Sequence, residues 1–92
     1  MMSTITKQKL KKYYDLTSKA LGIVKKSIIR GQEKNAKKII EMVTNYLSDA
    51  KYFEKKGNLV DAFAALNYSH GWLDSGVRLK VFKVKDNKLF TV

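Results

Sequence analysis

The sequence contains no cysteine and no proline, and it has a single histidine. The absence of cysteine excludes a disulfide framework, a thiolate zinc site and a cysteine nucleophile, and it suits a reducing cytoplasm. One histidine excludes a multi-histidine metal site, and the acidic residues show no metal-ligand spacing, so we expect no cofactor. No stretch approaches the ~20 apolar residues of a membrane span, and the N-terminal residues form no apolar leader. We therefore expect a soluble cytoplasmic protein with no membrane partner.

The composition fits one small, basic globular domain. The chain has 92 residues, of which 45% are hydrophobic and 29% charged, so it can form one hydrophobic core but not two. Its formal net charge is +11, and fourteen of its nineteen Lys and Arg residues lie within residues 1–57. A basic field of this strength attracts nucleic acid, anionic surfaces or an acidic patch on another protein.

Three segments repeat their apolar residues at alternating spacings of four and three, which is typical of amphipathic helices. They predict helices over about residues 6–29, 33–56 and 59–79. Gly31 and Gly57 follow the first two segments, at positions where a glycine ends a helix in the left-handed conformation. The predicted fold is all-α: an antiparallel three-helix bundle that forms one helical domain over residues 1–92.

The helical spacing stops after the third segment. The apolar residues beyond it are Val81, Phe82, Val84, Leu89 and Phe90. They flank a Lys-Asp-Asn-Lys stretch, and Asp-Asn is a turn signal, so the pattern indicates extended backbone or a weak hairpin. We expect residues 80–92 to form a short extended tail that packs back onto the bundle.

The third predicted helix is unusual because it carries no Lys or Arg between Gly57 and Val77. A helix that is apolar or small all round is typically buried all round, and two neighbouring helices cannot cover it completely. A third surface is therefore expected: the tail, a second copy of the chain, or another protein. The residues predicted to meet it are Ala64, Tyr68, Gly71, Trp72 and Ser75. Trp72 is the natural interface anchor, although an ordinary core position explains it equally well.

His70 and Asp74 are four residues apart and share one helical face, so the carboxylate can hold the imidazole. This polar pair suits acid–base chemistry, but the sequence places no nucleophile beside it. His70 also falls on the apolar stripe between Leu66 and Leu73, which favours a hydrogen-bonded structural histidine over a ligand or catalytic role. We expect that the protein is not an enzyme.

Basic residues also flank the turn between the first two predicted helices. The candidate anion-binding residues, here named the lysine corner, are Arg30, Lys34, Lys37 and Lys38. The three lysines begin a helix, where the dipole disfavours cations, and free amides at a helix start suit a phosphate or carboxylate. The alternative is a solvated lysine face that keeps the protein soluble. Few arginines and no exposed aromatic residues nearby argue against stacking recognition of nucleic acid.

Three motifs resemble one known family. They are Gly57-Asn-Leu-Val-Asp-Ala62, Tyr68-Ser-His-Gly-Trp-Leu-Asp-Ser-Gly-Val-Arg-Leu79 and Leu89-Phe-Thr-Val92. They are similar to the archaeal domain of unknown function 357 family, and the resemblance implies a compact helical fold in an archaeal cytoplasmic protein, with no established activity. Two positions depart from the pattern: Asn67 replaces a smaller or apolar residue, and Lys80 stands where glycine is common.

Two functions follow as hypotheses. The first is a non-enzymatic helical interaction or accessory module that binds a protein partner or itself, as a homodimer, through the third helix. The alternative is a nucleic-acid-associated basic protein that binds RNA or DNA through the lysine corner. Sedimentation tests the first hypothesis, and the salt dependence of binding tests the second.

Overall fold

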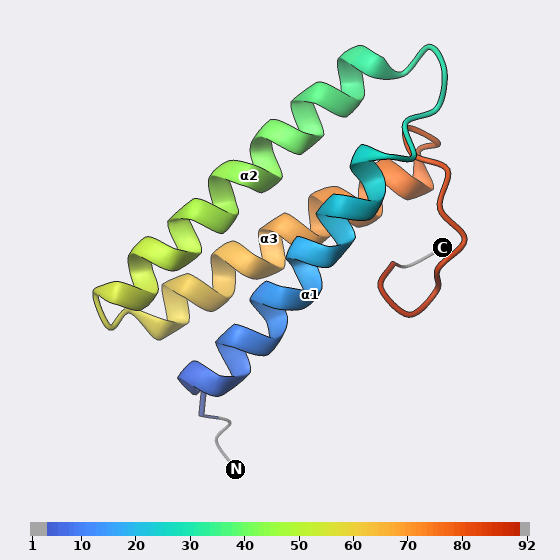
Figure 1. The fold of residues 1–92 in the computed structure, drawn as a ribbon. Helices are drawn as coiled ribbons and strands as arrows, with labels where there is room; N and C mark the ends of the chain where they lie inside the picture. The colour runs from blue at the N-terminus through green and yellow to red at the C-terminus, as the bar shows by residue number, and fades with distance from the viewer. Residues whose placement is uncertain (1–3, 91–92) are drawn as a thin grey trace.

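A computed structural model describes residues 4–90 as a bundle of three helices (Figure 1). The helices are α1 (Lys7–Lys25), α2 (Glu33–Lys55) and α3 (Leu59–Arg78), and they are followed by a C-terminal segment, residues 79–90. Within the described residues there is no strand, only an isolated bridge. The all-α three-helix fold expected from the sequence is confirmed. The turn between α1 and α2, the end of α3 and the C-terminal segment lie at the same end of the bundle (Figure 1).

Helix α1 begins at a side-chain cap and ends earlier than its apolar spacing predicts. The Thr6 hydroxyl accepts a hydrogen bond of 3.0 Å from the Lys9 amide, which satisfies one of the unpaired amides of the first turn. Helical spacing continues to Ile29, but the helix ends at Lys25. The reason is that Ile28 forms an antiparallel bridge with Phe82 of the C-terminal segment.

Two backbone hydrogen bonds hold this bridge. The Ile29 amide donates to the Val81 carbonyl at 2.9 Å, and the Lys83 amide donates to the Ser27 carbonyl at 2.8 Å. The last turn expected for α1 is therefore replaced by extended backbone that pairs with the C-terminal segment. The bridge gives the backbone N–H and C=O groups of this stretch the hydrogen bonds that a further turn of helix would have given them.

Helix α2 presents a regular apolar stripe to the bundle, and glycine forms the turn at each of its ends. The buried residues of the stripe are Ala36, Ile39, Val43, Leu47 and Ala50. Gly31 and Gly57 have φ of +93° and +79°, a left-handed conformation that side chains disfavour. The two short turns let α2 run antiparallel to both of its neighbours in the chain (Figure 1).

The buried face of α3 is built mainly from small residues. Its members are Ala62, Ala65, Leu66, Ser69, Leu73, Gly76 and Val77. A Cβ atom on Gly76 would lie 2.6 Å from the Phe82 ring, closer than real contacts allow. Gly76 is thus required by the close approach of the C-terminal segment, and Phe82 is only 1% exposed.

The C-terminal segment completes the core, as expected for the tail. Val81, Phe82, Leu89 and Phe90 are all buried. The Asp86 carboxylate shapes the intervening turn because it accepts hydrogen bonds from the Lys88 amide at 2.8 Å and the Leu89 amide at 3.1 Å. These two bonds lower the pKa of Asp86. Residues 91 and 92, which the sequence places in the tail, lie outside the described residues.

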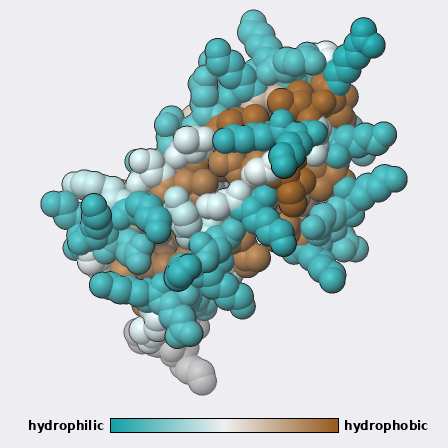
Figure 2. Space-filling view, in the orientation of Figure 1, coloured by the Kyte–Doolittle hydropathy of each residue, from teal (hydrophilic) through white to brown (hydrophobic). Residues whose placement is uncertain are grey.

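Hydrophilic side chains project around apolar patches on the face of the molecule that Figure 2 shows. In residues 4–90, none of the three helices has the length and apolar character needed to cross a membrane. The molecule is elongated, with principal dimensions of 43 × 24 × 17 Å, so its two ends are well separated.

Candidate functional site

One face of α3 is apolar yet left open by the other residues of the range 4–90. Large hydrophobic side chains on it are exposed: Val60 by 70%, Tyr68 by 62%, Trp72 by 39% and Leu79 by 74%. The full set, here named the α3 outer face, is Val60, Ala64, Tyr68, Gly71, Trp72, Ser75 and Leu79. At 100° per residue these positions occupy one third of the helix circumference. The five interaction residues predicted from the sequence all belong to this face.

Gly71 is one of the residues that line a shallow hollow on the α3 outer face. The hollow has a volume of about 340 Å³ and is lined by Asn67, Tyr68, Gly71, Trp72 and Ser75. A Cβ atom on Gly71 would meet no atom within 4 Å. Glycine within a helix costs about 1 kcal/mol relative to alanine. The packing of residues 4–90 gives no reason for this cost, in contrast to Gly76.

Tyr68 is held in position despite its exposure. Its ring stacks on the ring of Tyr46 from α2, with centroids 5.6 Å apart and an interplanar angle of 29°. Offset stacked rings attract each other beyond the contribution of their buried area. One side of the hollow is therefore a fixed aromatic wall that would lose little conformational freedom on binding.

The rest of the α3 circumference is better covered than its composition suggested. The small residues Ala62, Ala65, Ser69 and Gly76 are buried inside the molecule. Phe82 of the C-terminal segment covers the end of this side, and Leu89 and Phe90 pack near His70. The expectation of a further surface therefore applies to the α3 outer face, not to the whole helix.

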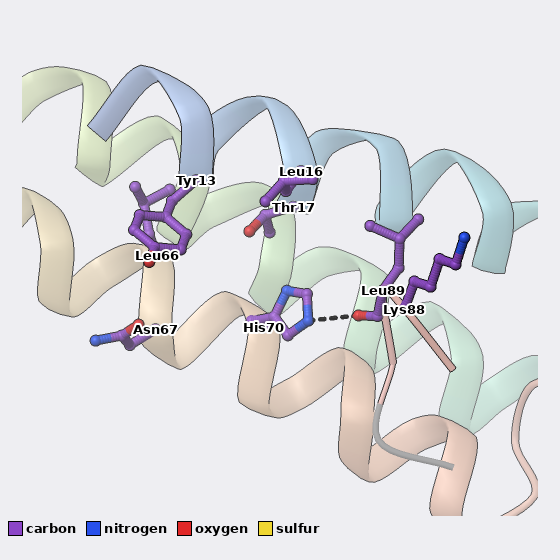
Figure 3. Close-up of a pocket in the computed structure, with 8 residues that line it drawn as sticks. All are labelled: Tyr13, Leu16, Thr17, Leu66, Asn67, His70, Lys88 and Leu89. Carbon is purple, nitrogen blue, oxygen red and sulfur yellow. Dashed lines mark hydrogen bonds between the residues drawn. The ribbon is translucent and has the colours of Figure 1, made fainter. Parts of the chain in front are cut away.

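His70, the first member of the predicted polar pair with Asp74, lies beside the C-terminal segment (Figure 3). His70 Nε2 donates a hydrogen bond of 2.6 Å to the Leu89 carbonyl, since a carbonyl oxygen can only accept. The same nitrogen is 3.9 Å from Asp74 Oδ1. The imidazole also stacks on the Phe90 ring, with centroids 6.5 Å apart. These contacts give His70 a structural role: it fastens the C-terminal segment to α3.

A cavity of about 280 Å³ opens next to this histidine. The side chains around it come from α1, α3 and the C-terminal segment: Tyr13, Leu16, Thr17, Leu66, Asn67, His70, Lys88 and Leu89 (Figure 3). The ring nitrogen that faces Leu89 already donates to a backbone oxygen, so it is not available as a base. Within residues 4–90 no three His, Asp or Glu side chains gather as metal ligands.

The four residues of the lysine corner are all exposed at the turn between α1 and α2. The acid within this stretch, Glu33, folds back so that its carboxylate accepts hydrogen bonds from the Gly31 amide at 3.0 and 3.2 Å. It therefore caps the turn instead of pairing with a lysine, and none of the four cations forms an ion pair within residues 4–90. The structure brings the lysine corner together without enclosing it.

Sequence reasoning missed a second basic group at the same end of the bundle. Its members are Arg78, Lys80, Lys83 and Lys85, which line one hollow. The four residues look unremarkable in the sequence because they are spread over the end of α3 and the C-terminal segment. The available signal was Lys80, a lysine at a helix end where glycine is expected.

The fold and these surfaces define a class: a small all-α three-helix bundle whose C-terminal segment completes the core and whose third helix leaves one face open. A family model described as "Protein of unknown function (DUF357)" matches residues 12–82. The chain belongs to this domain of unknown function 357 family, which confirms the resemblance seen in the sequence motifs. The match extends back into α1 and stops before the Leu89-to-Val92 motif. No match is found among curated proteins or among solved structures.

Proposed function

We propose that this protein is a non-enzymatic interaction module that self-associates through the α3 outer face. The observation that supports this most directly is Gly71, a glycine with open space around it in a hollow that Tyr68 and Trp72 also line. Small residues at a helix surface permit another helix to approach closely. A face that carries both a recess and projecting aromatic rings can be complementary to itself, as a two-fold symmetric dimer requires.

The distribution of charge favours a second copy of the chain as the partner. Two molecules that each carry +11 repel each other over most of their surfaces. The third helix has no Lys or Arg until Arg78, at its last residue, so two copies meet with least repulsion there. An acidic partner would instead be drawn to the basic end of the bundle. The α3 outer face thus suits self-association better than it suits binding of an acidic protein.

Sedimentation velocity over micromolar to submillimolar concentrations tests the proposal. We expect reversible dimerisation of the wild-type chain, and we expect Gly71→Gln to abolish it by filling the hollow. The variant should keep its fold because glutamine is a better helix former than glycine and its Cβ atom would meet no atom within 4 Å. Gly22→Gln is the matched control, since Gly22 is also an exposed helical glycine with open space around it, but on α1.

Two results would contradict self-association through this face. One is a wild-type chain that remains monomeric at every concentration. The other is dimerisation that survives Gly71→Gln, or that Gly22→Gln reduces equally.

An archaeal origin and a cytoplasmic location remain predictions from the sequence and are part of this proposal.

A second candidate function, binding of RNA or DNA through the lysine corner, is favoured by the position of Glu33. Its carboxylate accepts hydrogen bonds from the Gly31 amide and forms no ion pair with the neighbouring lysines, which leaves their ammonium groups available to a phosphate. Affinity for an oligonucleotide should fall steeply with salt, and the Lys34→Ala, Lys37→Ala, Lys38→Ala triple variant should reduce the slope of log K against log salt by about 2–3. An unchanged slope would refute this function.

A further inference from the structure

We propose that the second basic group forms a binding site for a small phosphorylated compound. The site, here named the basic hollow, has a volume of about 420 Å³ and lies where the C-terminal segment crosses the end of α3. Its cationic residues are Arg78, Lys80, Lys83 and Lys85, and no acidic side chain lines it. This site is separate from the α3 outer face, so it goes beyond the proposed self-association.

Four cations around one hollow repel one another unless an anion lies between them. Within residues 4–90 none of the three lysines forms an ion pair, so their charges are not neutralised by direct contact with a described carboxylate. A ligand with at least two negative charges would relieve this repulsion. Arginine can bind a phosphate through two parallel hydrogen bonds, and lysine binds it as a compact charge, so the group contains both common kinds of phosphate ligand.

The backbone of Lys80 supports the assignment. The Lys80 amide donates to the Val77 carbonyl and the Val81 amide donates to the Gly76 carbonyl, which is the Schellman arrangement at a helix end. The residue in the left-handed position of this motif is usually glycine, yet Lys80 occupies it with φ of +64°. The chain accepts a conformation that lysine disfavours, and the side chain it gains there is a cation in the basic hollow.

The wall of the basic hollow is fixed before any ligand arrives. The bridge between Ile28 and Phe82 ties the C-terminal segment to the end of α1, and Phe82 is seated against Gly76. Lys83 and Lys85 are two residues apart in the segment that continues from this bridge, and both line the hollow. A preformed site spends less binding free energy on ordering its side chains.

Size and lining indicate the class of ligand. The volume of about 420 Å³ falls within the range of small-molecule sites, and apolar side chains of Ile29, Val77 and Val84 complete the lining. This combination suits a phosphate ester whose charged end meets the cations and whose compact organic part meets the apolar wall. A single nucleic-acid strand fits less well, because Phe82 is buried and no exposed aromatic ring lines the hollow for base stacking.

Titration of the ¹⁵N-labelled full chain with ADP, at low ionic strength, tests the assignment. We expect saturable shifts of the amide signals of residues 78–85 and of Ile29. The double variant Lys83→Ala, Lys85→Ala should weaken binding at least tenfold. The control double variant Lys7→Ala, Lys55→Ala removes the same charge at the other end of a molecule 43 Å long, and it should weaken binding less than twofold.

The variant Lys80→Gly separates a binding role of the Lys80 side chain from a purely structural one. Glycine suits the left-handed backbone, so the variant should melt at a higher temperature than the wild type while binding ADP more weakly. Inorganic pyrophosphate should compete with ADP for the same signals. Competition by pyrophosphate together with this opposite change in stability and affinity would support the site.

Several outcomes would overturn the site. They are an absence of shifts at millimolar ADP, equal weakening by the control variant, and Lys80→Gly leaving affinity unchanged. Binding to vesicles of anionic phospholipid without binding of ADP would also overturn it, because the phosphate source would then be a membrane surface. RNA that binds residues 78–85 and is not displaced by ADP or pyrophosphate would also overturn the assignment, because the ligand would then be a nucleic acid.

Discussion

The same substitution, glycine to alanine, should have opposite effects at two positions of α3 that are five residues apart. At Gly76, a new Cβ would lie 2.6 and 2.8 Å from two atoms of the Phe82 ring and 3.1 Å from the Ile39 methyl group. Phe82 cannot move away freely, because it is buried and its backbone is bridged to Ile28. At Gly71, the new methyl group would meet no atom within 4 Å.

The magnitudes follow from two opposing effects. Alanine improves helix propensity by about 1 kcal/mol at both positions. Overpacking a filled core costs about 1–3 kcal/mol, and a contact as short as 2.6 Å with a buried ring places Gly76→Ala in the upper part of that range, at about 2–3 kcal/mol. After the gain in helix propensity is subtracted, the variant should be destabilised by about 1–2 kcal/mol overall. Gly71→Ala should be stabilised by up to about 1 kcal/mol. The two variants should therefore differ by about 2–3 kcal/mol, or roughly 10–20 °C in Tm for a domain of this size.

Urea denaturation followed by far-UV circular dichroism measures this difference directly. The experiment should use low micromolar protein, so that self-association does not add to the stability of the wild type. Gly76→Ala combined with Phe82→Leu should recover part of the lost stability, because the smaller side chain makes room for the methyl group. If Gly76→Ala were as stable as Gly71→Ala, the close seating of Phe82 on α3 would be incorrect.

Two further predictions concern single polar groups. The Ser69 hydroxyl is fully buried and has no hydrogen-bond partner within the described chain. Ser69→Ala should therefore raise the free energy of unfolding by about 1 kcal/mol. A loss of stability in urea denaturation would show that the hydroxyl is paired. Hydrogen bonds from the amides of Lys88 and Leu89 lower the pKa of Asp86 in the folded protein. The ionised carboxylate therefore stabilises the fold at pH values above the pKa of Asp86 in the unfolded chain. This contribution is lost as the pH falls through the lowered pKa of the folded protein. The stability difference between wild type and Asp86→Ala should therefore shrink between pH 5 and pH 2, and a difference that is constant over this range would contradict the role of the charge.

The helices could be predicted from the sequence because their signals are local. Apolar spacing and the glycines at the turns depend only on residues a few positions apart. The end of α1 could not be predicted in the same way, because Ser27 to Ile29 leave the helix to pair with residues 81–83. No periodic pattern within the first helix contains information about a partner more than fifty residues away.

The candidate site shows the same division between local and distant contacts. The spacing of the α3 outer face placed Tyr68, Gly71 and Trp72 together, and the structure agrees. Composition alone could not separate the open Gly71 from the buried Gly76, since both are glycines on one helix and only Phe82 distinguishes them. The position of His70 on an apolar stripe indicated a structural role, but its partner is a backbone carbonyl nineteen residues further on, which side-chain patterns do not record.

The position of Trp72 also gives the protein an internal optical reporter. It is the one tryptophan in the chain, it lies on the α3 outer face, and 39% of it is accessible to water. Indole emission moves to shorter wavelength when water is removed from around the ring. Fluorescence of the unmodified protein will therefore report whether this face is covered, without a dye, a tag or an added reporter residue.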